Sequence, residues 1–466
     1  MLALGLQILG FHSLRHDDAY ISFRYGQNLA SGNGLVFNPG ERFLGATSPG
    51  HMLLSAVAYR GWGKESTPSI MSVLGCVGWT AQAVALWFLL RTTLGPLGAG
   101  MVSAVVALGG ARSGQWVALE TNLAVGATLG SLALAARGRA GGAAVLGGIG
   151  VLLRPDAALA VAAIAILLAA RDGVRAAVRF AVVAALLVAP WLIFATVYFG
   201  TPLPNSAAVQ FQRSELLPYL VHAFSLAAST LVPVESSALA WVVAGGALLA
   251  AVLLVLRSRD FGLHGLALYG ALHLTAYSFL RPQIGHDWHL YPSTLIAVVL
   301  GMVGVWGITL RLPPRLRPAM QRALCVALPL AFGLRFAADA VSQRGELWFG
   351  ARDQAYRKVA GLLAARSNPE DRFASPEVGT IAYLTELRAF DLVGLVSRHD
   401  VAVDGPVRWV VLDPTFLHYA PPVEPLEVVD AGDFRAVVFE VPEKRSYVDY
   451  FRRVQSQLAA RGAPQP

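Results

Sequence analysis

Charged residues are scarce in this sequence. They make up 14% of its 466 residues, whereas a soluble globular chain carries about 25%. Hydrophobic residues make up 55%, and the mean hydropathy is +0.54. This composition excludes an ordinary cytosolic enzyme and a disordered protein. The formal net charge of +8 does not indicate nucleic-acid binding, because the basic residues lie at the ends of apolar segments and form no dense run interleaved with aromatics.

The motifs of common cofactor sites are missing as well. The two cysteines, Cys76 and Cys325, both lie in apolar segments, so neither a disulfide framework nor a metal cluster is indicated. The sequence has no Walker A motif, no Gly-rich dinucleotide turn after a strand and no His-Glu-x-x-His. Nothing in it predicts a nucleotide site.

Apolar stretches recur through residues 1–339 and predict a membrane domain of about 11 spans. Several stretches are shorter than the ~20 residues that a span needs, but their Gly/Ala-rich composition suits close packing in a helix bundle. The stretches lie near 2–14, 69–90, 96–111, 121–136, 141–153, 157–170, 177–198, 238–256, 262–279, 290–310 and 323–339.

The arginines predict the orientation of these spans, because basic loops stay on the cytoplasmic side. If successive spans alternate in direction and every arginine cluster lies on the cytoplasmic side, residues 50–62 and 216–232 cannot cross the membrane. This arrangement then places the intervening loops, and everything after residue 340, outside. The clusters are Arg91; Arg137 and Arg139; Arg171, Arg175 and Arg179; Arg257 and Arg259; Arg311, Arg315, Arg317 and Arg322.

The tail is more polar and has the pattern of a soluble α/β domain. Residues 348–366 and 446–460 have helical periodicity, and residues 372–375, 407–412 and 435–441 are strand candidates. We therefore expect two domains, a transmembrane domain over 1–339 and an extracytoplasmic α/β domain over 340–466.

The first outer loop opens with two adjacent carboxylates, Asp17 and Asp18, directly after an apolar segment. Charges at a membrane surface are costly unless they have a function or a partner. Two like charges this close can raise one pKa, which suits a general base. The alternative is that they cap a helix beginning at Ala19. Both can hold, since one carboxylate can cap while the other faces a site.

Three further outer positions carry polar groups that allow two interpretations each. Glu120 lies at the mouth of a span, where it can bind a ligand or be solvated by headgroups. Asn205, with Gln210, lies in a Pro-rich loop that can also be a plain turn. Arg154 can bind a phosphate or pair with Asp156.

The loop over residues 281–291 is crowded with polar and aromatic side chains. Its tryptophan and tyrosine can be interface anchors, and its two histidines with one carboxylate form a weak metal-ligand pattern. The residues in question are Arg281, His286, Asp287, Trp288, His289 and Tyr291.

The first loop, DDAYISFRYGQNLASGNGLVFNPGER followed by ATSPG, resembles the opening of bacterial membrane glycosyltransferases of the GT-C fold. It most resembles the branch of the mycobacterial terminal arabinofuranosyltransferases and their relatives. The next element departs from that family, because Gly45 to His51 lack its aromatics. The matching residues are Asp17, Asp18, Tyr20, Arg24, Tyr25, Gly32, Gly34, Leu35, Val36, Phe37, Asn38, Pro39, Gly40 and Glu41.

Weaker similarities to the same family follow in the expected order along the chain. They are Leu119-Glu120-Thr121, Leu153-Arg154-Pro155-Asp156, Tyr198-Phe199-Gly200 with Pro204-Asn205, Gly285-His286-Asp287-Trp288, and in the tail Glu377 to Tyr383 and Phe390 to Leu395.

The resemblance implies a GT-C-like enzyme of the bacterial cytoplasmic membrane. It would move a sugar from a polyprenyl-phosphate donor to a cell-envelope glycan or lipid acceptor on the outer face, with Asp17 as the base, Asp18 as its neighbour, and Arg154 or Arg281 at the leaving phosphate. No cofactor is certain, although some relatives need a divalent cation. The substrate-binding residues expected are Tyr20, Arg24, Asn38, Glu41, Glu120, Arg154, Asn205, Arg281, His286 and Asp287.

Two other functions fit the same residues. A transporter or flippase for a lipid-linked or anionic glycan would use the carboxylates as translocation groups. A noncatalytic membrane assembly subunit would need them only for structure. The acidic residues cluster on one face rather than at mid-bilayer, and no pair of spans is symmetrically broken, which favours the glycosyltransferase.

Overall fold

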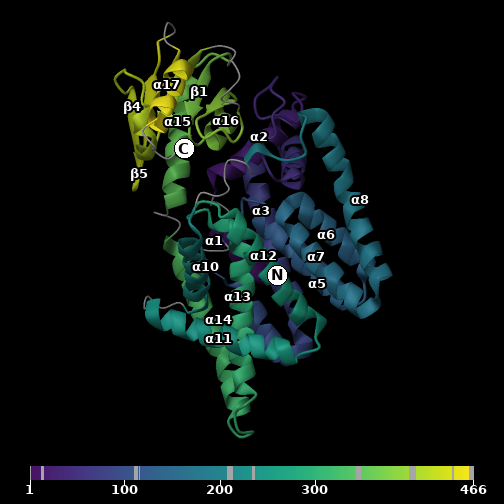
Figure 1. Ribbon diagram of the computed structural model, residues 1–466. Helices are drawn as coiled ribbons and strands as arrows, with labels where there is room; N and C mark the ends of the chain where they lie inside the picture. The colour runs from purple at the N-terminus through teal and green to yellow at the C-terminus, as the bar shows by residue number, and fades with distance from the viewer. Residues whose placement is uncertain are drawn as a thin grey trace. The chain divides into compact units, whose positions relative to one another are not determined.

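The computed structural model of the protein describes residues 2–11, 15–109, 114, 116–206, 214–232, 237–342, 348–397, 406–442 and 446–460 (Figure 1). The chain divides into two compact units. One, here called the helical unit, contains Met1–His12, Val73–Ile193 and Gln210–Ala340. The other, here called the sheet unit, contains Ser13–Ser72, Phe194–Val209 and Val341–Pro466. The sheet unit thus combines the first loop with the whole tail, which lie at opposite ends of the sequence.

In the part of the chain that the structure describes, the helical unit contains apolar helices and two short 3-10 turns. Three helices, α3 (Pro49–Ala107), α8 (Val174–Phe199) and α14 (Arg317–Ser342), have residues in both units. The remaining elements are α1 (Leu2–Phe11), α5 (Thr121–Ala136), α6 (Ala140–Leu153), η1 (Pro155–Ala157), α7 (Ala158–Asp172), α10 (Leu216–Leu231), α11 (Ser237–Arg257), α12 (Phe261–Leu280), η2 (Asp287–His289) and α13 (Tyr291–Thr309).

Several helices have the length and composition of membrane spans, as the hydropathy predicts. Among the described residues, five are long and apolar enough to cross a membrane, and they are Pro49–Ala107, Val174–Phe199, Ala240–Arg257, Tyr291–Thr309 and Arg317–Val341. Shorter apolar helices such as α5, α6 and α10 accompany them. The total of about 11 spans stays a prediction.

Helix α3 joins segments that the hydropathy pattern separates. The stretches 50–62, 69–90 and 96–111 are divided by polar or Gly-Pro positions, yet the helix is assigned without interruption from Pro49 to Ala107. Gly63 and Gly95 have φ of 80° and 71° within it. Glycine adopts this left-handed region at little cost, so helical backbone can lie on both sides of these two positions.

Small residues let the helices of this unit approach closely. A Cβ on Gly304 of α13 would lie 2.0 Å from the carbonyl oxygen of Ala247 in α11, and one on Gly126 of α5 would lie 2.6 Å from that of Gly78 in α3. Side chains other than hydrogen do not fit at these positions. The Gly/Ala-rich composition is therefore used for backbone-to-backbone packing.

The tail of the sheet unit forms a mixed five-stranded sheet of order β2-β1-β3-β5-β4. Strand β1 pairs in parallel with β2 and β3, while β5 pairs antiparallel with β3 and β4. The bounds are β1 (Arg372–Ser375), β2 (Arg388–Asp391), β3 (Val407–Leu412), β4 (Glu427–Ala431), β5 (Phe434–Glu440), α15 (Trp348–Arg366), α16 (Gly379–Thr385), η3 (Pro414–Tyr419) and α17 (Tyr447–Ala460).

Helices cover both faces of this sheet (Figure 1). Val437 and Phe439 of β5 share one cluster of buried residues with Phe451 of α17. On the other face α15 packs against β4 and β5, and its Tyr356 ring lies 5.4 Å from the ring of Phe434. The expected α/β tail is confirmed. The sequence does not predict the short strands β2 and β4 or the seven-residue helix α16, because so few residues show too little periodicity.

Candidate functional site

The first-loop acid pair begins helix α2 (Asp17–Ala30) in the sheet unit. The N-cap is His16, whose Nδ1 accepts a hydrogen bond from the backbone N–H of Asp18 at 3.2 Å. Burial lowers the pKa of His16 to about 4, so the neutral ring can act as this acceptor. The helix therefore starts two residues before Ala19, and neither carboxylate occupies its cap.

Asp17 instead binds the beginning of another helix. Its side chain is buried, and its two oxygens accept hydrogen bonds from the backbone N–H groups of Gly379 at 2.9 Å and Thr380 at 2.7 Å. These residues open α16, where free N–H groups need an acceptor. A Cβ on Gly379 would lie 2.1 Å from the Asp17 carbonyl oxygen. Burial raises the pKa of Asp17, although the two N–H bonds act in the opposite direction. Asp17 thus anchors α16 to α2.

Asp18 has the more accessible carboxylate of the pair. Its side chain is 31% exposed, and its Oδ2 lies 3.8 Å from His16 Nδ1. An acceptor hydroxyl can approach a carboxylate that solvent reaches, whereas it would have to displace two backbone hydrogen bonds to reach that of Asp17.

Arg24 and Tyr20, the next residues of the motif, bind groups of the tail. Arg24 is 2% exposed and donates to the carbonyl oxygens of Phe37 at 3.3 Å and Glu386 at 2.8 Å. The Tyr20 hydroxyl accepts a hydrogen bond from Arg357 of α15. Both side chains therefore connect α2 with its surroundings in the sheet unit.

Asn38 extends the sheet beyond β2. Its amide donates to the carbonyl of Ala389 at 2.9 Å and its carbonyl oxygen accepts from the N–H of the same residue at 2.9 Å, which is the pairing that a neighbouring strand would make. Glu41 follows with an ion pair to Arg372 of β1 at 3.3 Å. The Asn-Pro-Gly-Glu segment therefore docks the first loop on the tail.

Asn205 makes a similar contact from the internal segment. Its backbone N–H donates to the carbonyl of Leu44 at 2.8 Å, and its side-chain amide donates to the carbonyl of Gly394. Gln210 lies outside the described residues. The structure thus brings seven of the predicted site residues together in one unit, and their roles toward a substrate stay predictions. The seven are Asp17, Asp18, Tyr20, Arg24, Asn38, Glu41 and Asn205.

The other five predicted residues belong to the helical unit, where Arg154 is the centre of a buried network. Its guanidinium pairs with Asp156 at 2.8 Å and with Glu120 at 3.4 Å, and it donates to the Thr121 hydroxyl at 3.0 Å. Asp156 also accepts a hydrogen bond from the Tyr277 hydroxyl at 2.8 Å. Arg154 thus pairs with Asp156, and its binding of a phosphate stays a prediction.

Sequence reasoning missed the part of this network that α12 supplies. His273 lies with Nε2 3.4 Å from Asp156 Oδ2 and with Nδ1 2.6 Å from the Ser293 hydroxyl. His273 and Tyr277 are four residues apart in an otherwise apolar helix, which places them on one face. Polar side chains at this spacing in a candidate span are the signal that could have identified them.

The loop before α13 carries the remaining three residues. Arg281 is the C-cap of α12 with φ of 44°, and its Nε has no hydrogen-bond partner among the described residues. Asp287 Oδ1 lies 2.8 Å from Nε2 of His222 in α10. The His286 ring stacks on Trp288 with 4.7 Å between centroids. No group of three or more His, Cys, Asp or Glu suited to a metal ion occurs in the described ranges.

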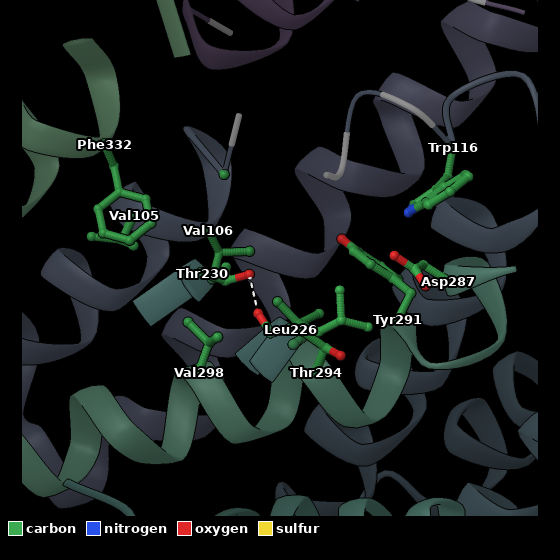
Figure 2. Close-up of a pocket in the computed structure, with 12 residues that line it drawn as sticks. Val105, Val106, Trp116, Leu226, Thr230, Asp287, Tyr291, Thr294, Val298 and Phe332 are labelled. Carbon is green, nitrogen blue, oxygen red and sulfur yellow. Dashed lines mark hydrogen bonds between the residues drawn. The ribbon is translucent and has the colours of Figure 1, made fainter. Parts of the chain in front are cut away.

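An apolar pocket with an empty volume of about 590 Å³ lies beside this loop. Figure 2 shows Asp287 and Trp116 at one side of it, while Val105, Leu226, Val298 and Phe332 line the remainder. The lining comes from α3, α10, α13 and α14, from the 281–291 loop, and from Gly109 and Trp116, which lie between α3 and α5. A pocket of this kind suits an apolar chain.

Comparison with known proteins adds three findings. A family model described as a domain of unknown function (DUF8728) matches residues 345–454. No curated protein matches the chain. Solved structures, in contrast, match over nearly the whole chain.

The structure of ArnT from Cupriavidus metallidurans in the apo state has a TM-score of 0.62 and 14% identity, covering 94% of this chain and 95% of that one. The structure of the same protein bound to undecaprenyl phosphate has a TM-score of 0.61 and 14% identity, and the match covers 94% of this chain and 96% of that one. The structure of the Archaeoglobus fulgidus oligosaccharyltransferase in complex with Zn and sulfate has a TM-score of 0.59 and 13% identity. The match covers 90% of this chain and 68% of that one. These neighbours are GT-C-fold glycosyltransferases. The chain therefore has the GT-C-like fold that its first loop predicts, with several apolar helices and a C-terminal sheet domain.

Proposed function

We propose that the protein is a membrane glycosyltransferase that moves a sugar from a polyprenyl-phosphate donor to a cell-envelope glycan or lipid acceptor. The observation that carries this proposal is the shared fold over 94% of the chain with a protein whose structure holds undecaprenyl phosphate. The apolar pocket of the helical unit supports it, because a polyprenyl chain needs an apolar site. The site lies on the outer face of the bacterial cytoplasmic membrane, with the tail outside.

Asp18 is the base in this proposal, and Asp17 is the neighbour that holds α2 against α16. The Asp18 carboxylate takes the proton of the acceptor hydroxyl, and the hydroxyl oxygen attacks the anomeric carbon in line. The bond from that carbon to the phosphate oxygen breaks, and polyprenyl phosphate leaves with the electron pair. The hydrogen bonds of Asp17 to Gly379 and Thr380 support this order of roles, which reverses the one expected from the sequence.

Arg281 is the better supported of the two arginines for the leaving phosphate. The guanidinium of Arg154 already donates to Glu120, Thr121 and Asp156, whereas the Nε of Arg281 lacks a partner in the described part of the chain. A guanidinium can bind two phosphate oxygens at once and stabilise the charge that develops on them.

Because Arg281 has a φ of 44°, substitutions there can distinguish its effect on stability from its effect on donor binding. We expect Arg281→Gly to keep or raise the melting temperature, because glycine adopts this conformation at less cost, and still to raise the KM for the donor. Arg281→Lys should also raise the KM for the donor, since lysine cannot make the bidentate contact with the phosphate. Unchanged donor KM values in both variants would make Arg281 a structural residue.

The donor class is tested with purified full-length protein, a panel of radiolabelled polyprenyl-phosphate sugars and a cell-envelope extract. We expect one lipid-linked label to move to the extract. Transfer from a soluble nucleotide sugar with no polyprenyl lipid present would contradict the proposal. Movement of intact labelled lipid across a vesicle membrane, without a new glycosidic bond, would instead indicate the transporter.

A further inference from the structure

The sheet unit contains a second pocket, which is polar and separate from the acid pair. Its empty volume is about 410 Å³. Three cationic side chains and one carboxylate line it, namely Arg15, Lys64, Arg357 and Glu65. The cations come from the segment before α2, from α3 and from α15, and Tyr383 of α16 completes the lining. Four separate parts of the chain thus converge on the pocket, and three of its four charged lining side chains are cationic.

Hydrogen bonds hold these cations in place. Lys64 donates to the carbonyl of Leu384 at 2.9 Å and to Glu386 at 2.8 Å. The Glu386 side chain is 57% exposed, so water screens this pair and leaves the ammonium available to another anion. The lysine is therefore ordered before a ligand arrives, which lowers the entropy cost of binding.

Arg357 and Arg15 are ordered in the same way. Arg357 donates through Nε to Asp353 at 2.7 Å and through Nη2 to the Tyr20 hydroxyl, while Arg15 donates through Nη2 to the Ser69 hydroxyl at 2.7 Å. Side chains that are partly accessible and already oriented are suited to bind an oxyanion by charge-assisted hydrogen bonds.

We propose that this pocket binds an oxyanion, a phosphate or a carboxylate, carried by the acceptor. The choice of the acceptor rests on the proposed function, since the base acts on the acceptor hydroxyl. Arg357 contacts Tyr20, which lies one turn after Asp17 on α2, so the pocket adjoins the helix that carries the acid pair. The lining has no large apolar surface for a polyprenyl chain, whereas the pocket of the helical unit does.

Inorganic phosphate is the probe for the pocket itself. We expect phosphate to raise the melting temperature of the full-length protein in detergent at constant ionic strength, with chloride as the reference. Lys64→Gln and Arg357→Gln should each weaken phosphate binding by about 10-fold or more, while Lys64→Arg should keep it. Lys358→Gln is the matched control, because Lys358 is exposed on the same helix as Arg357. No phosphate effect in the native protein, or the same effect in all variants, would overturn the proposal.

Transfer kinetics then identify which substrate brings the anion. In Lys64→Gln we expect the KM for the envelope acceptor to rise and that for the lipid-linked donor to stay. A rise in the donor KM alone would contradict the acceptor assignment. Lys64-dependent phosphate binding in a protein that transfers no sugar would contradict the proposed function and leave the anion site standing, so the two failures are distinguishable.

Discussion

Replacing Asp18 by Asn is expected to slow sugar transfer by about 10²–10⁴-fold, the usual contribution of a general base. The amide has the shape of the carboxylate but cannot take the acceptor proton. Since the Asp18 side chain is 31% exposed, the substitution should leave the melting temperature and donor binding nearly unchanged. The rate of label transfer, donor binding and the melting temperature are measured on the same preparation.

Asp17→Asn should behave differently. One side-chain atom would still accept a backbone hydrogen bond, but its NH₂ would face the other N–H of the Gly379 and Thr380 pair. A buried donor left without an acceptor costs about 1–3 kcal/mol. We therefore expect a lower melting temperature and a rate that falls less than in Asp18→Asn.

The two variants decide between the carboxylates. If Asp17→Asn stops transfer at an unchanged melting temperature while Asp18→Asn remains active, Asp17 is the base, as the sequence alone suggested. Full activity of both variants would remove the main chemical support for the glycosyltransferase. Asp449→Asn, an exposed carboxylate on α17, is the control for a change of charge alone.

Arg154→Ala is expected to destabilise the protein by about 3–5 kcal/mol, because it leaves buried carboxylates without their cation. The Arg154 side chain is 6% exposed, and those of Glu120 and Asp156 are 11% and 12% exposed. Unfolding of the full-length protein in detergent measures the loss. The corresponding exposed pair, Arg171 with Asp172, is the control, and Arg171→Ala should change little.

A double variant tests the cause of that loss. Arg154→Met with Asp156→Leu removes both charges of the closest pair, so it should cost less than the sum of the single substitutions. Additive losses would show that the pair is not coupled. If the Arg154→Ala variant folds with normal stability but has a raised KM for the donor, Arg154 would be assigned to binding of the donor phosphate.

Much of the fold follows from local patterns. The shortage of charge and the apolar runs identify a membrane protein, and the helices α15 and α17 and the strands β1, β3 and β5 lie where periodicity predicts them. The interruption between residues 62 and 69 is the informative exception. Hydropathy falls there, yet helical backbone lies on both sides of Gly63, whose φ of 80° glycine adopts at little cost.

The sequence predicts which residue types form the candidate site, but not which groups these residues contact. The sequence by itself determined the class of protein, the α/β tail and the acid pair of the first loop, because composition, periodicity and adjacent motifs are local properties. Only the tertiary structure decided that Asp17 meets Gly379 and Thr380, and that Asn38 pairs with Ala389. These partners are backbone groups more than 340 residues away, and a backbone N–H has no signature in the sequence. Which carboxylate stays accessible therefore depends on where the tail folds.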